Sequence, residues 1–275
     1  MTMTTASPPR FDRARLLGVE IDRLTMDETL ERCREVIDSG GFAQHVAINA
    51  AKTVAAREDA ALRQVISDCE LVTADGQSVV WASHVLGDPL PERVAGIDLM
   101  NNLLALAEQR QYRVFILGAR PEVLESAVKV LRERHPGIDI VGYRDGYFSD
   151  DQGAEVADEI RRARAQILFV AMSSPRKEYW LSRHGRRVNV PFIMGVGGSI
   201  DVIAGVTRRA PRSLQRLGLE WCYRLAQEPR RLIKRYWYTN TRFLGLTAQA
   251  AVLRVRSSLL RTIARVWEDL SGAIR

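Results

Sequence analysis

A carboxylate followed by glycine is the first candidate for chemistry in this chain. Asp75 and Gly76 come directly after a short apolar run that predicts a strand over residues 71–74. A carboxylate at the end of a strand can act as a general base that takes a proton from a nucleophile. The same position can cap the N-terminus of a following helix. The spacing leaves both roles open.

Basic residues at two places could bind an anion. Arg93 lies between two predicted elements, where its guanidinium could hold a phosphate with two hydrogen bonds or stand on the surface. Arg224, Arg231 and Lys234 follow one another at steps of seven and three, which would place them on one face of a helix. Such a face could close over a diphosphate, or it could be a row of solvated charges.

Glycines after two further predicted strands extend this set. Gly118 follows one strand, and Gly197 and Gly198 follow another in the segment 195–201. Glycine-rich turns before a helix can bring backbone N–H groups close to a phosphate, although many are purely structural. The chain has no G-x-G-x-x-G, Walker A or G-x-S-x-G motif to support a specific chemistry.

The elements that must position these residues follow from the apolar pattern. Predicted strands cover residues 16–21, 45–49, 71–74, 113–117, 139–142, 167–171 and 192–196. Predicted helices cover residues 25–38, 52–68, 96–110, 121–135, 152–165 and 176–184. This alternation is typical of an α/β fold with a mainly parallel sheet and helices on both faces. Ligands of such folds bind at the carboxyl ends of the strands, which is where the candidates lie.

Composition narrows the protein class. The chain has 275 residues, of which 46% are hydrophobic and 27% are charged, which excludes a largely disordered protein. No apolar stretch is long enough to predict a membrane-spanning helix, and residues 1–9 lack the apolar segment of a signal peptide. The scattered Cys33, Cys69 and Cys222 argue against disulfides and for a reducing compartment. The four histidines form no cluster with cysteines or carboxylates, so we expect no zinc site.

The charge is concentrated in the C-terminal quarter. Residues 207–275 hold 15 basic and 4 acidic residues, a net charge of +11, which leaves −4 for residues 1–206. We therefore expect three parts: a flexible arm (1–15), an α/β core (16–206) and a basic helical appendage (207–275). Such an asymmetry points to an anionic partner for the appendage, namely phosphate groups, a membrane surface or nucleic acid.

The end of the appendage has the pattern of a basic amphipathic helix. Pro229 suits the first turn of a helix. Apolar residues then recur at steps of three or four, with arginines on the opposite side; the apolar ones are Val252, Val255, Leu259, Ile263, Val266 and Leu270, and the arginines are Arg254, Arg261 and Arg265. This pattern favours binding to an anionic membrane surface. The alternative is packing against the protein's own core or a second subunit.

A series of motifs in fixed order connects these candidates. They are Asp75-Gly76-x-x-Val79-Val80-Trp81, Arg93-Val94-x-Gly96-x-Asp98-Leu99, Val114-Phe115-Ile116-Leu117-Gly118, Gly142-Tyr143 with Gly146-Tyr147-Phe148, Ser174-Pro175-Arg176-Lys177-Glu178, Gly195-Val196-Gly197-Gly198-Ser199-Ile200-Asp201, Arg209-Ala210-Pro211, and Gly218-Leu219-Glu220-Trp221-x-Tyr223-Arg224-Leu225 with Glu228-Pro229. In these motifs the chain resembles the WecG/TagA/CpsF family of bacterial glycosyltransferases, glycosyltransferase family 26, from about Leu16 to Leu244.

This resemblance implies a function. The family has a Rossmann-like core and a C-terminal appendage that reaches the membrane and helps to complete the active site. Its members transfer a sugar, with inversion, from a UDP-sugar to a polyprenyl-diphosphate-linked saccharide. The expected products are exopolysaccharide, capsule or teichoic-acid-type polymers, and the expected location is cytoplasmic, peripheral on the inner face of the bacterial cell membrane.

The resemblance also assigns roles. Asp75 aligns with the proposed general base and Arg93 with an active-site arginine, while Arg224, Arg231 and Lys234 match cations thought to hold the diphosphate. The remaining candidates for substrate binding are Asn49, Gly118, Lys177, Gly197, Gly198 and Asp201.

The chain departs from the family pattern at two positions. Ala47 stands where a threonine is frequent, and Lys177 stands where a glutamine is usual. A lysine cannot accept a hydrogen bond and adds a charge, which weakens the expectation of N-acetylmannosamine as the donor sugar. Lys177 could instead contact a phosphate or a sugar carboxylate.

The chain contains no Asp-x-Asp, the motif by which many glycosyltransferases bind a divalent metal. We therefore expect a transfer without a metal or other cofactor, in which cations stabilise the leaving diphosphate.

Two other function classes remain to be weighed. An NAD-type Rossmann oxidoreductase would need an early G-x-G-x-x-G, which is missing. A nucleic-acid-binding protein acting through the basic tail is disfavoured, because few aromatic residues beyond Trp237 and Trp267 are interleaved with the cations. A homo-oligomer is left open.

Overall fold

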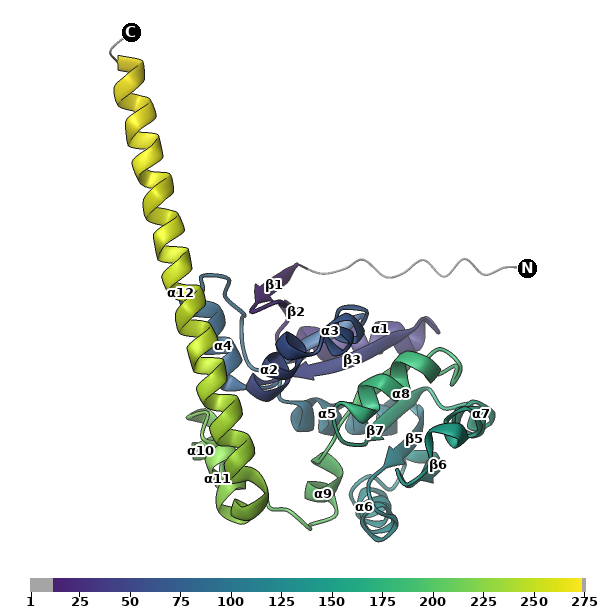
Figure 1. Cartoon of the computed structure of the whole chain (residues 1–275). Helices are drawn as coiled ribbons and strands as arrows, with labels where there is room; N and C mark the ends of the chain where they lie inside the picture. The colour runs from purple at the N-terminus through teal and green to yellow at the C-terminus, as the bar shows by residue number, and fades with distance from the viewer. Residues whose placement is uncertain (1–11, 274–275) are drawn as a thin grey trace, which may run out of the picture.

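A six-stranded parallel sheet forms the centre of the protein (Figure 1). The structure is a computed structural model that describes residues 12–273. The side chains of residues 216, 231, 258, 259 and 263–273 lie outside the described part. The strand order is β4-β3-β8-β7-β5-β6. The strands are β3 (Ala43–Ile48), β4 (Leu71–Ala74), β5 (Arg113–Gly118), β6 (Asp139–Arg144), β7 (Ile167–Ala171) and β8 (Phe192–Gly195). β4 and β7 are buried along their whole length, as expected for a parallel sheet that is covered on both faces.

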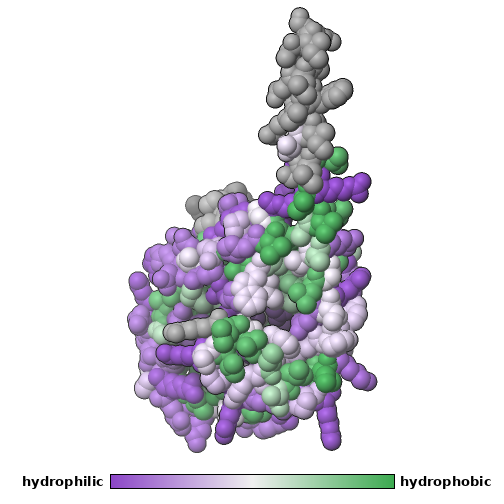
Figure 2. All heavy atoms as spheres, turned by 90° about the vertical axis from the view of Figure 1, so that its left-hand side faces the viewer, coloured by the Kyte–Doolittle hydropathy of each residue, from purple (hydrophilic) through white to green (hydrophobic). Residues whose placement is uncertain are grey.

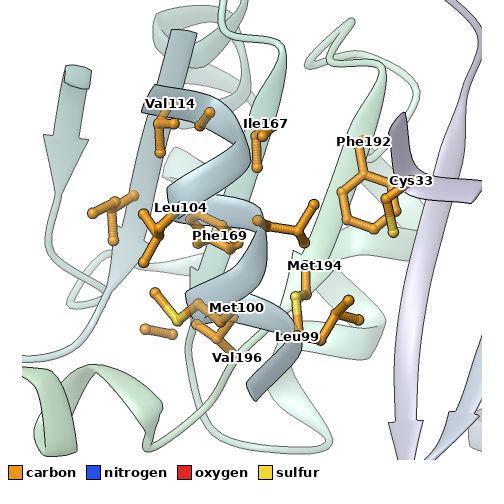
Figure 3. Close-up of a cluster of buried hydrophobic side chains, with 14 of the residues drawn as sticks. Cys33, Leu99, Met100, Leu104, Val114, Ile167, Phe169, Phe192, Met194 and Val196 are labelled. Atoms are coloured by element: carbon orange, nitrogen blue, oxygen red, sulfur yellow. The ribbon is translucent and has the colours of Figure 1, made fainter. Parts of the chain in front are cut away.

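Helices cover both faces of this sheet, which confirms the Rossmann-like α/β fold. One face carries α1 (Met26–Asp38), α5 (Gly96–Arg110), α6 (Pro121–Arg134) and α9 (Ser199–Ile203). The other carries α2 (Ala50–Glu58), α3 (Ala60–Ser67), α7 (Gly153–Ala163) and α8 (Arg176–His184), with the short η1 (Asp150–Gln152) before α7. In Figure 3, Leu99, Met100 and Leu104 of α5 lie over Phe169 and Met194 of the sheet. This packing fixes the N-terminus of α5 at the carboxyl edge of the strands.

An antiparallel hairpin replaces the single strand predicted over residues 16–21. β1 (Arg13–Leu16) pairs with β2 (Val19–Asp22), and between them Leu17 and Gly18 turn the chain with φ of 51° and 90°. The buried Asp22 carboxylate ties the hairpin to the sheet, because Oδ1 accepts from Arg13 Nε (2.7 Å) and Oδ2 from the Val72 N–H (2.6 Å). Residues 13–15 of the expected arm are therefore in a strand, while residues 1–11 lie outside the described part.

Two helices also differ from the predictions. The predicted helix over residues 52–68 is interrupted at Asp59, whose Oδ1 accepts from the N–H groups of Ala61 and Leu62 and so begins α3. The helix α4 (Gln77–Val85) was not predicted. It starts at Gly76 without any side-chain cap, and although its buried residues share one face, the apolar Trp81 and Val85 lie on the exposed face and hide that pattern in the sequence.

Three helices form the appendage: α10 (Arg212–Arg216), α11 (Glu220–Gln227) and α12 (Pro229–Ala273). α12 begins at Pro229, as the sequence predicts, and packs against α2, while its distal half extends beyond the body (Figure 1). Phe243 of α12 is buried in the same apolar cluster as residues of α2, α3 and α4. Within residues 12–273, none of the helices combines the length and the apolar character needed to cross a membrane.

Candidate active site

Asp75 lies at the carboxyl edge of the sheet, where β4 ends. Its backbone N–H donates to the carbonyl of Ile48 (2.8 Å), which continues the pairing of β4 with β3. Its side chain does not cap α4, whose N-cap is Gly76. Instead Oδ1 accepts from the Gly96 N–H (2.9 Å) at the first turn of α5. Oδ2 has no hydrogen-bond partner among the described residues, so one oxygen holds the side chain in place while the other can accept a proton.

A salt bridge joins the core to the appendage beside this carboxylate. Arg93 Nη1 donates to Glu220 Oε2 (3.3 Å), and both side chains are largely buried. Arg93 lies in the loop before α5 and Glu220 begins α11. The contact therefore locates the appendage relative to the edge of the sheet.

Arg209, at the start of the appendage and before α10, is held from two sides. Its Nη1 and Nη2 each donate to one oxygen of Asp98 at 2.6 Å, and its Nε lies 3.9 Å from Glu220 Oε1. The hydrogen bonding to the Asp98 carboxylate raises the pKa of this guanidinium against the opposing effect of burial, and the charges of Asp98, Glu220 and Asp75 add to the rise. Arg209 and Asp75 are thus near enough to interact electrostatically. Arg209 Nε is buried without a hydrogen-bond partner.

A close packing contact brings the last arginine to the same place. Gly218, with φ of 69°, turns the chain between α10 and α11, and a Cβ at this residue would lie 3.0 Å from Gln77 and Trp81 of α4. The turn positions α11 beside α4, and on α11 Arg224 Nη2 lies 3.9 Å from Glu220 Oε1, one helical turn earlier. Arg93, Arg209 and Arg224 therefore surround two carboxylates, Asp98 and Glu220, and we call these five residues the arginine cluster.

The arrangement can take up an anion beside a proton acceptor. Glu220 contacts all three guanidinium groups of the arginine cluster, two of them only at 3.9 Å. Arginine keeps its charge at all relevant pH values and suits the two-pronged binding of phosphate. A diphosphate that enters would find three positive groups already gathered around one carboxylate.

Lys177 belongs to a second group of charges. It follows the end of β7, in the first turn of α8, and its Nζ lies 3.2 Å from Glu178 Oε1. Lys52 of α2 donates to the same oxygen at 2.8 Å. All three side chains are largely buried, and we call them the lysine cluster. Burial, with the nearby charge of Lys52, lowers the pKa of Lys177 to about 8.

The pKa of Glu178 moves in the direction opposite to its burial. Burial raises it, but the positive charges of Lys52 and Lys177 outweigh that effect and bring the pKa to about 2. Glu178 is therefore a carboxylate over the whole physiological range.

The remaining candidates also lie at the carboxyl ends of strands. Asn49 caps α2, since its Oδ1 accepts from the Lys52 N–H (3.0 Å). Gly118 has φ of 121°, and a Cβ there would lie 2.5 Å from the Ala171 carbonyl carbon, so the approach of β5 to β7 requires glycine. Gly197 opens onto free space, and Asp201 lies close by in the first turn of α9.

The prediction that Arg224, Arg231 and Lys234 share one helix face is wrong. α11 ends at Gln227 and α12 begins at Pro229, so Arg224 is on a different helix from the other two. The break follows from Glu228, whose backbone leaves the helical region (φ −134°, ψ 58°). Lys234 is exposed, and it forms no hydrogen bond or ion pair with the arginine cluster within the described part of the chain. The side chain of Arg231 lies outside the described residues.

Three residues of the arginine cluster had no assigned role in the sequence. Asp98, Arg209 and Glu220 occur in the motifs, but nothing in their spacing shows that segments around 93, 209 and 220 meet. The sequence feature that could have drawn attention to these three residues is their charge within largely apolar motifs. In the described part of the chain, no three histidine, cysteine or acidic side chains are grouped so that they could bind a metal ion.

Comparison with known proteins adds independent evidence. Residues 14–257 match the model of the family described as "Glycosyl transferase WecG/TagA/CpsF family". A Bacillus spizizenii (strain W23) protein named N-acetylglucosaminyldiphosphoundecaprenol N-acetyl-beta-D-mannosaminyltransferase is 38% identical over 167 residues, which span 61% of this chain and 64% of that protein.

Staphylococcus aureus proteins of the same name match over a longer range. The one from strain MW2 is 32% identical over 232 residues, covering 84% of this chain and 91% of the relative. The one from strain NCTC 8325 is 33% identical over 224 residues, covering 81% and 87%. The similarity therefore includes both the core and much of the appendage.

Proposed function

Because the chain belongs to the WecG/TagA/CpsF family of glycosyltransferases, we propose that it moves a sugar from a UDP-sugar to a polyprenyl-diphosphate-linked saccharide in the synthesis of a cell-surface polysaccharide. One observation supports the proposal independently of membership in the family. Asp75 keeps one carboxylate oxygen without a hydrogen-bond partner among the described residues, and its charge acts on Arg209 of the arginine cluster.

The proposed reaction is a single displacement. The Asp75 carboxylate takes the proton of the acceptor hydroxyl, and that oxygen attacks the anomeric carbon of the donor sugar. The bond from this carbon to the β-phosphate oxygen breaks, and UDP leaves with the bonding electron pair. Attack from the face opposite to the leaving group inverts the anomeric configuration. Asp75 serves as the base and forms no covalent bond with the sugar.

The arginine cluster supports a role in binding diphosphate. Arg93, Arg209 and Arg224 can stabilise the negative charge that develops on the leaving UDP. Together with the absence of Asp-x-Asp from the sequence, this supports a transfer that needs no divalent metal. Arg231 and Lys234 remain candidates for the diphosphate of the lipid carrier.

Exposed apolar side chains support contact with a membrane. Trp81 and Val85 of α4, Leu217, Leu219 and Trp221 near α11, and Ile233 and Trp237 of α12 are all exposed, and Trp237 is 75% accessible. Figure 2 shows apolar groups on the side of the body that carries α12. Farther along α12, Val252, Val255 and Leu260 are exposed as well, between the exposed Arg254, Arg256 and Arg261. Such a surface suits an anionic bilayer, and it supports a peripheral location at the cytoplasmic face, where a lipid-linked acceptor is anchored.

The test is release of UDP from a panel of UDP-sugars, with a short polyprenyl-diphosphate-linked N-acetylglucosamine as acceptor and EDTA present. We expect turnover with one donor, and its identity names the transferred sugar. The acceptor in anionic vesicles should react faster than the same acceptor in neutral vesicles. Failure of the folded protein to bind UDP would overturn the proposal, and loss of turnover with EDTA would overturn its metal-independence.

A further inference from the structure

The lysine cluster has more positive charge than the protein around it balances. Lys52 and Lys177 both direct their ammonium groups at one oxygen of Glu178, at 2.8 and 3.2 Å. Two ammonium groups carry six N–H bonds, and among the described residues they form no hydrogen bond or ion pair other than those to Glu178 Oε1, while Glu178 Oε2 is buried without a hydrogen-bond partner. Lys177 is only 7% accessible and Glu178 only 2%. An excess positive charge that is buried this far is costly unless a further anion compensates it.

A third cation adds to this excess. Arg235 of α12 lies close enough for its charge to lower the pKa of Lys177 further. His45, on β3 beside Lys52, adds no positive charge at neutral pH, because burial lowers its pKa to about 3. The charged groups that act on the pKa of Lys177 are therefore Lys52 from α2, Glu178 from α8 and the exposed Arg235 from α12, with a net charge of +1 before Lys177 itself is counted.

The lysine cluster lies near the carboxyl edge of the sheet. Lys177 packs against Gly195, because a Cβ at that glycine would lie 2.8 Å from Lys177 Cε. Gly195 ends β8, and two residues later Gly197 has no atom within 4 Å of the place where its Cβ would be. The lysine cluster thus lies just below an open turn at the carboxyl edge, where α/β folds bind their ligands.

We propose that Lys177, assisted by Lys52 and Arg235, forms a subsite that binds an anionic group of the nucleotide-sugar donor and thereby helps to select the donor. This inference rests on the proposed function. The group is a phosphate of the UDP moiety or a carboxylate on the sugar, since both offer anionic oxygens to ammonium donors. Lys177 is then a determinant of specificity, and the chemical step remains with Asp75.

Replacing Lys177 should leave the fold intact. Lys177→Gln keeps the salt bridge from Lys52 to Glu178 at 2.8 Å, so no buried carboxylate loses its partner. Lys177→Arg retains a positive charge at the same place. The exposed Lys129 of α6 lies outside both charge clusters, and Lys129→Gln is the matched control for the loss of one lysine.

The experiment is calorimetric titration of the full-length protein with UDP, UDP-glucose and UDP-glucuronate at pH 7. If Lys177 binds a phosphate, Lys177→Gln weakens the binding of all three at least tenfold. If it binds a sugar carboxylate, only UDP-glucuronate binding weakens at least tenfold, and the other two stay within twofold. Lys177→Arg and Lys129→Gln should bind like the wild type. Unchanged binding of all three ligands by folded Lys177→Gln overturns the subsite alone, whereas a wild type that does not bind UDP also overturns the proposed function.

A second measurement needs no variant. An anion bound at Lys177 stabilises its protonated form, so wild-type protein at pH 8.5 should take up protons when the ligand binds. Titrations in two buffers with different ionisation enthalpies measure this uptake. Binding without proton uptake at this pH contradicts the proposal, even if the Lys177→Gln protein does not fold.

Discussion

The two charge clusters at the carboxyl edge are built on different principles. The arginine cluster combines three arginines with two carboxylates, is partly open to solvent, and joins the core to the appendage. The lysine cluster combines two lysines with one carboxylate and is buried between α2 and α8. Arginine keeps its charge and its planar geometry, whereas the charge of a buried lysine depends on pH and on its neighbours. This difference fits the proposed roles, which are the reaction and leaving-group binding for the first cluster with Asp75 and pH-sensitive ligand selection for the second.

The largest expected effect comes from removing the proposed base. Asp75→Asn should lower kcat by about 10²- to 10⁴-fold, because the amide still accepts from Gly96 but cannot take a proton. UDP affinity should stay within a few-fold. Steady-state kinetics and titration with UDP measure the two quantities. The control is Asp139→Asn at the exposed amino end of β6, which should have near-normal kcat, and near-normal turnover by Asp75→Asn would refute the assignment.

The second-largest effect is expected on stability, when the one carboxylate of the lysine cluster is removed. Glu178→Gln leaves two buried ammonium groups without a counter-charge, and we expect a loss of about 3–5 kcal/mol in the free energy of unfolding. Glu220→Gln, in the more open arginine cluster, should lose only about 1 kcal/mol. Urea unfolding of both variants makes the comparison. Equal losses would mean that the two clusters do not differ as described.

The pH dependence of stability should distinguish lysine from arginine chemistry. Burial and Lys52 lower the pKa of Lys177 from 10.5 to about 8. Between these pH values the unfolded chain binds more protons than the folded protein, so this lysine makes the free energy of unfolding rise with pH, by at most about 3 kcal/mol. Well below pH 8 the residue is protonated in both states and contributes no pH dependence.

Lys177→Gln should lack this component, and the quantity to measure is the wild-type curve minus the variant curve in urea unfolding from pH 7 to 10.5. Other lysines and tyrosines cancel in that difference. A flat difference would show that Lys177 has an ordinary pKa.

Arginine geometry should matter in the arginine cluster alone. Arg209→Lys keeps the charge but loses the paired hydrogen bonds to Asp98 at 2.6 Å, so we expect kcat/KM to fall about 10- to 100-fold. Arg187 makes a similar pair with Asp158 on the surface, at 2.9 and 2.6 Å. Arg187→Lys should leave kcat/KM unchanged. A similar small effect of both substitutions would remove Arg209 from the site.

The smallest effects are expected at the membrane surface. Neutralising Arg254 and Arg256 together should reduce partitioning onto anionic vesicles about 10- to 30-fold, since each cation near the surface contributes about 1 kcal/mol. Activity toward a short, water-soluble acceptor should not change. Vesicle co-sedimentation with varied anionic lipid measures the first quantity. If partitioning changes neither with the substitutions nor with the content of anionic lipid, α12 does not bind the membrane through these arginines.

The sequence predicted the sheet better than the site. β4, β7 and α8 begin and end where apolar periodicity places them, because strands buried on both faces and amphipathic helices carry strong local patterns. α4 was not predicted because Gly76 offers no side-chain cap and because the exposed Trp81 and Val85 are as apolar as the residues on the buried face. The break between α2 and α3 at Asp59 was not predicted because the helical pattern continues across it, although the aspartate itself caps α3.

The site was predicted in part, for a physical reason. Asp75 is a candidate because of its position after a strand and its family motif, whereas Arg93, in a loop between two elements, is a candidate mainly because of its family motif. Arg209 and Glu220 take part through contacts across more than a hundred residues, which no local pattern encodes. The placement of Arg224 and Arg231 on one helix failed because a single nonhelical residue, Glu228, separates α11 from α12.

The central claim is a single displacement in which Asp75 acts as base beside the arginine cluster. The anomeric configuration of the product, determined by NMR after transfer from a UDP-α-sugar, tests it most directly. We expect a β-linked product with the wild type, and the same product formed more slowly by Asp75→Asn. An α-linked product from the wild type would require a second displacement or a different mechanism, and it would contradict the role assigned to Asp75.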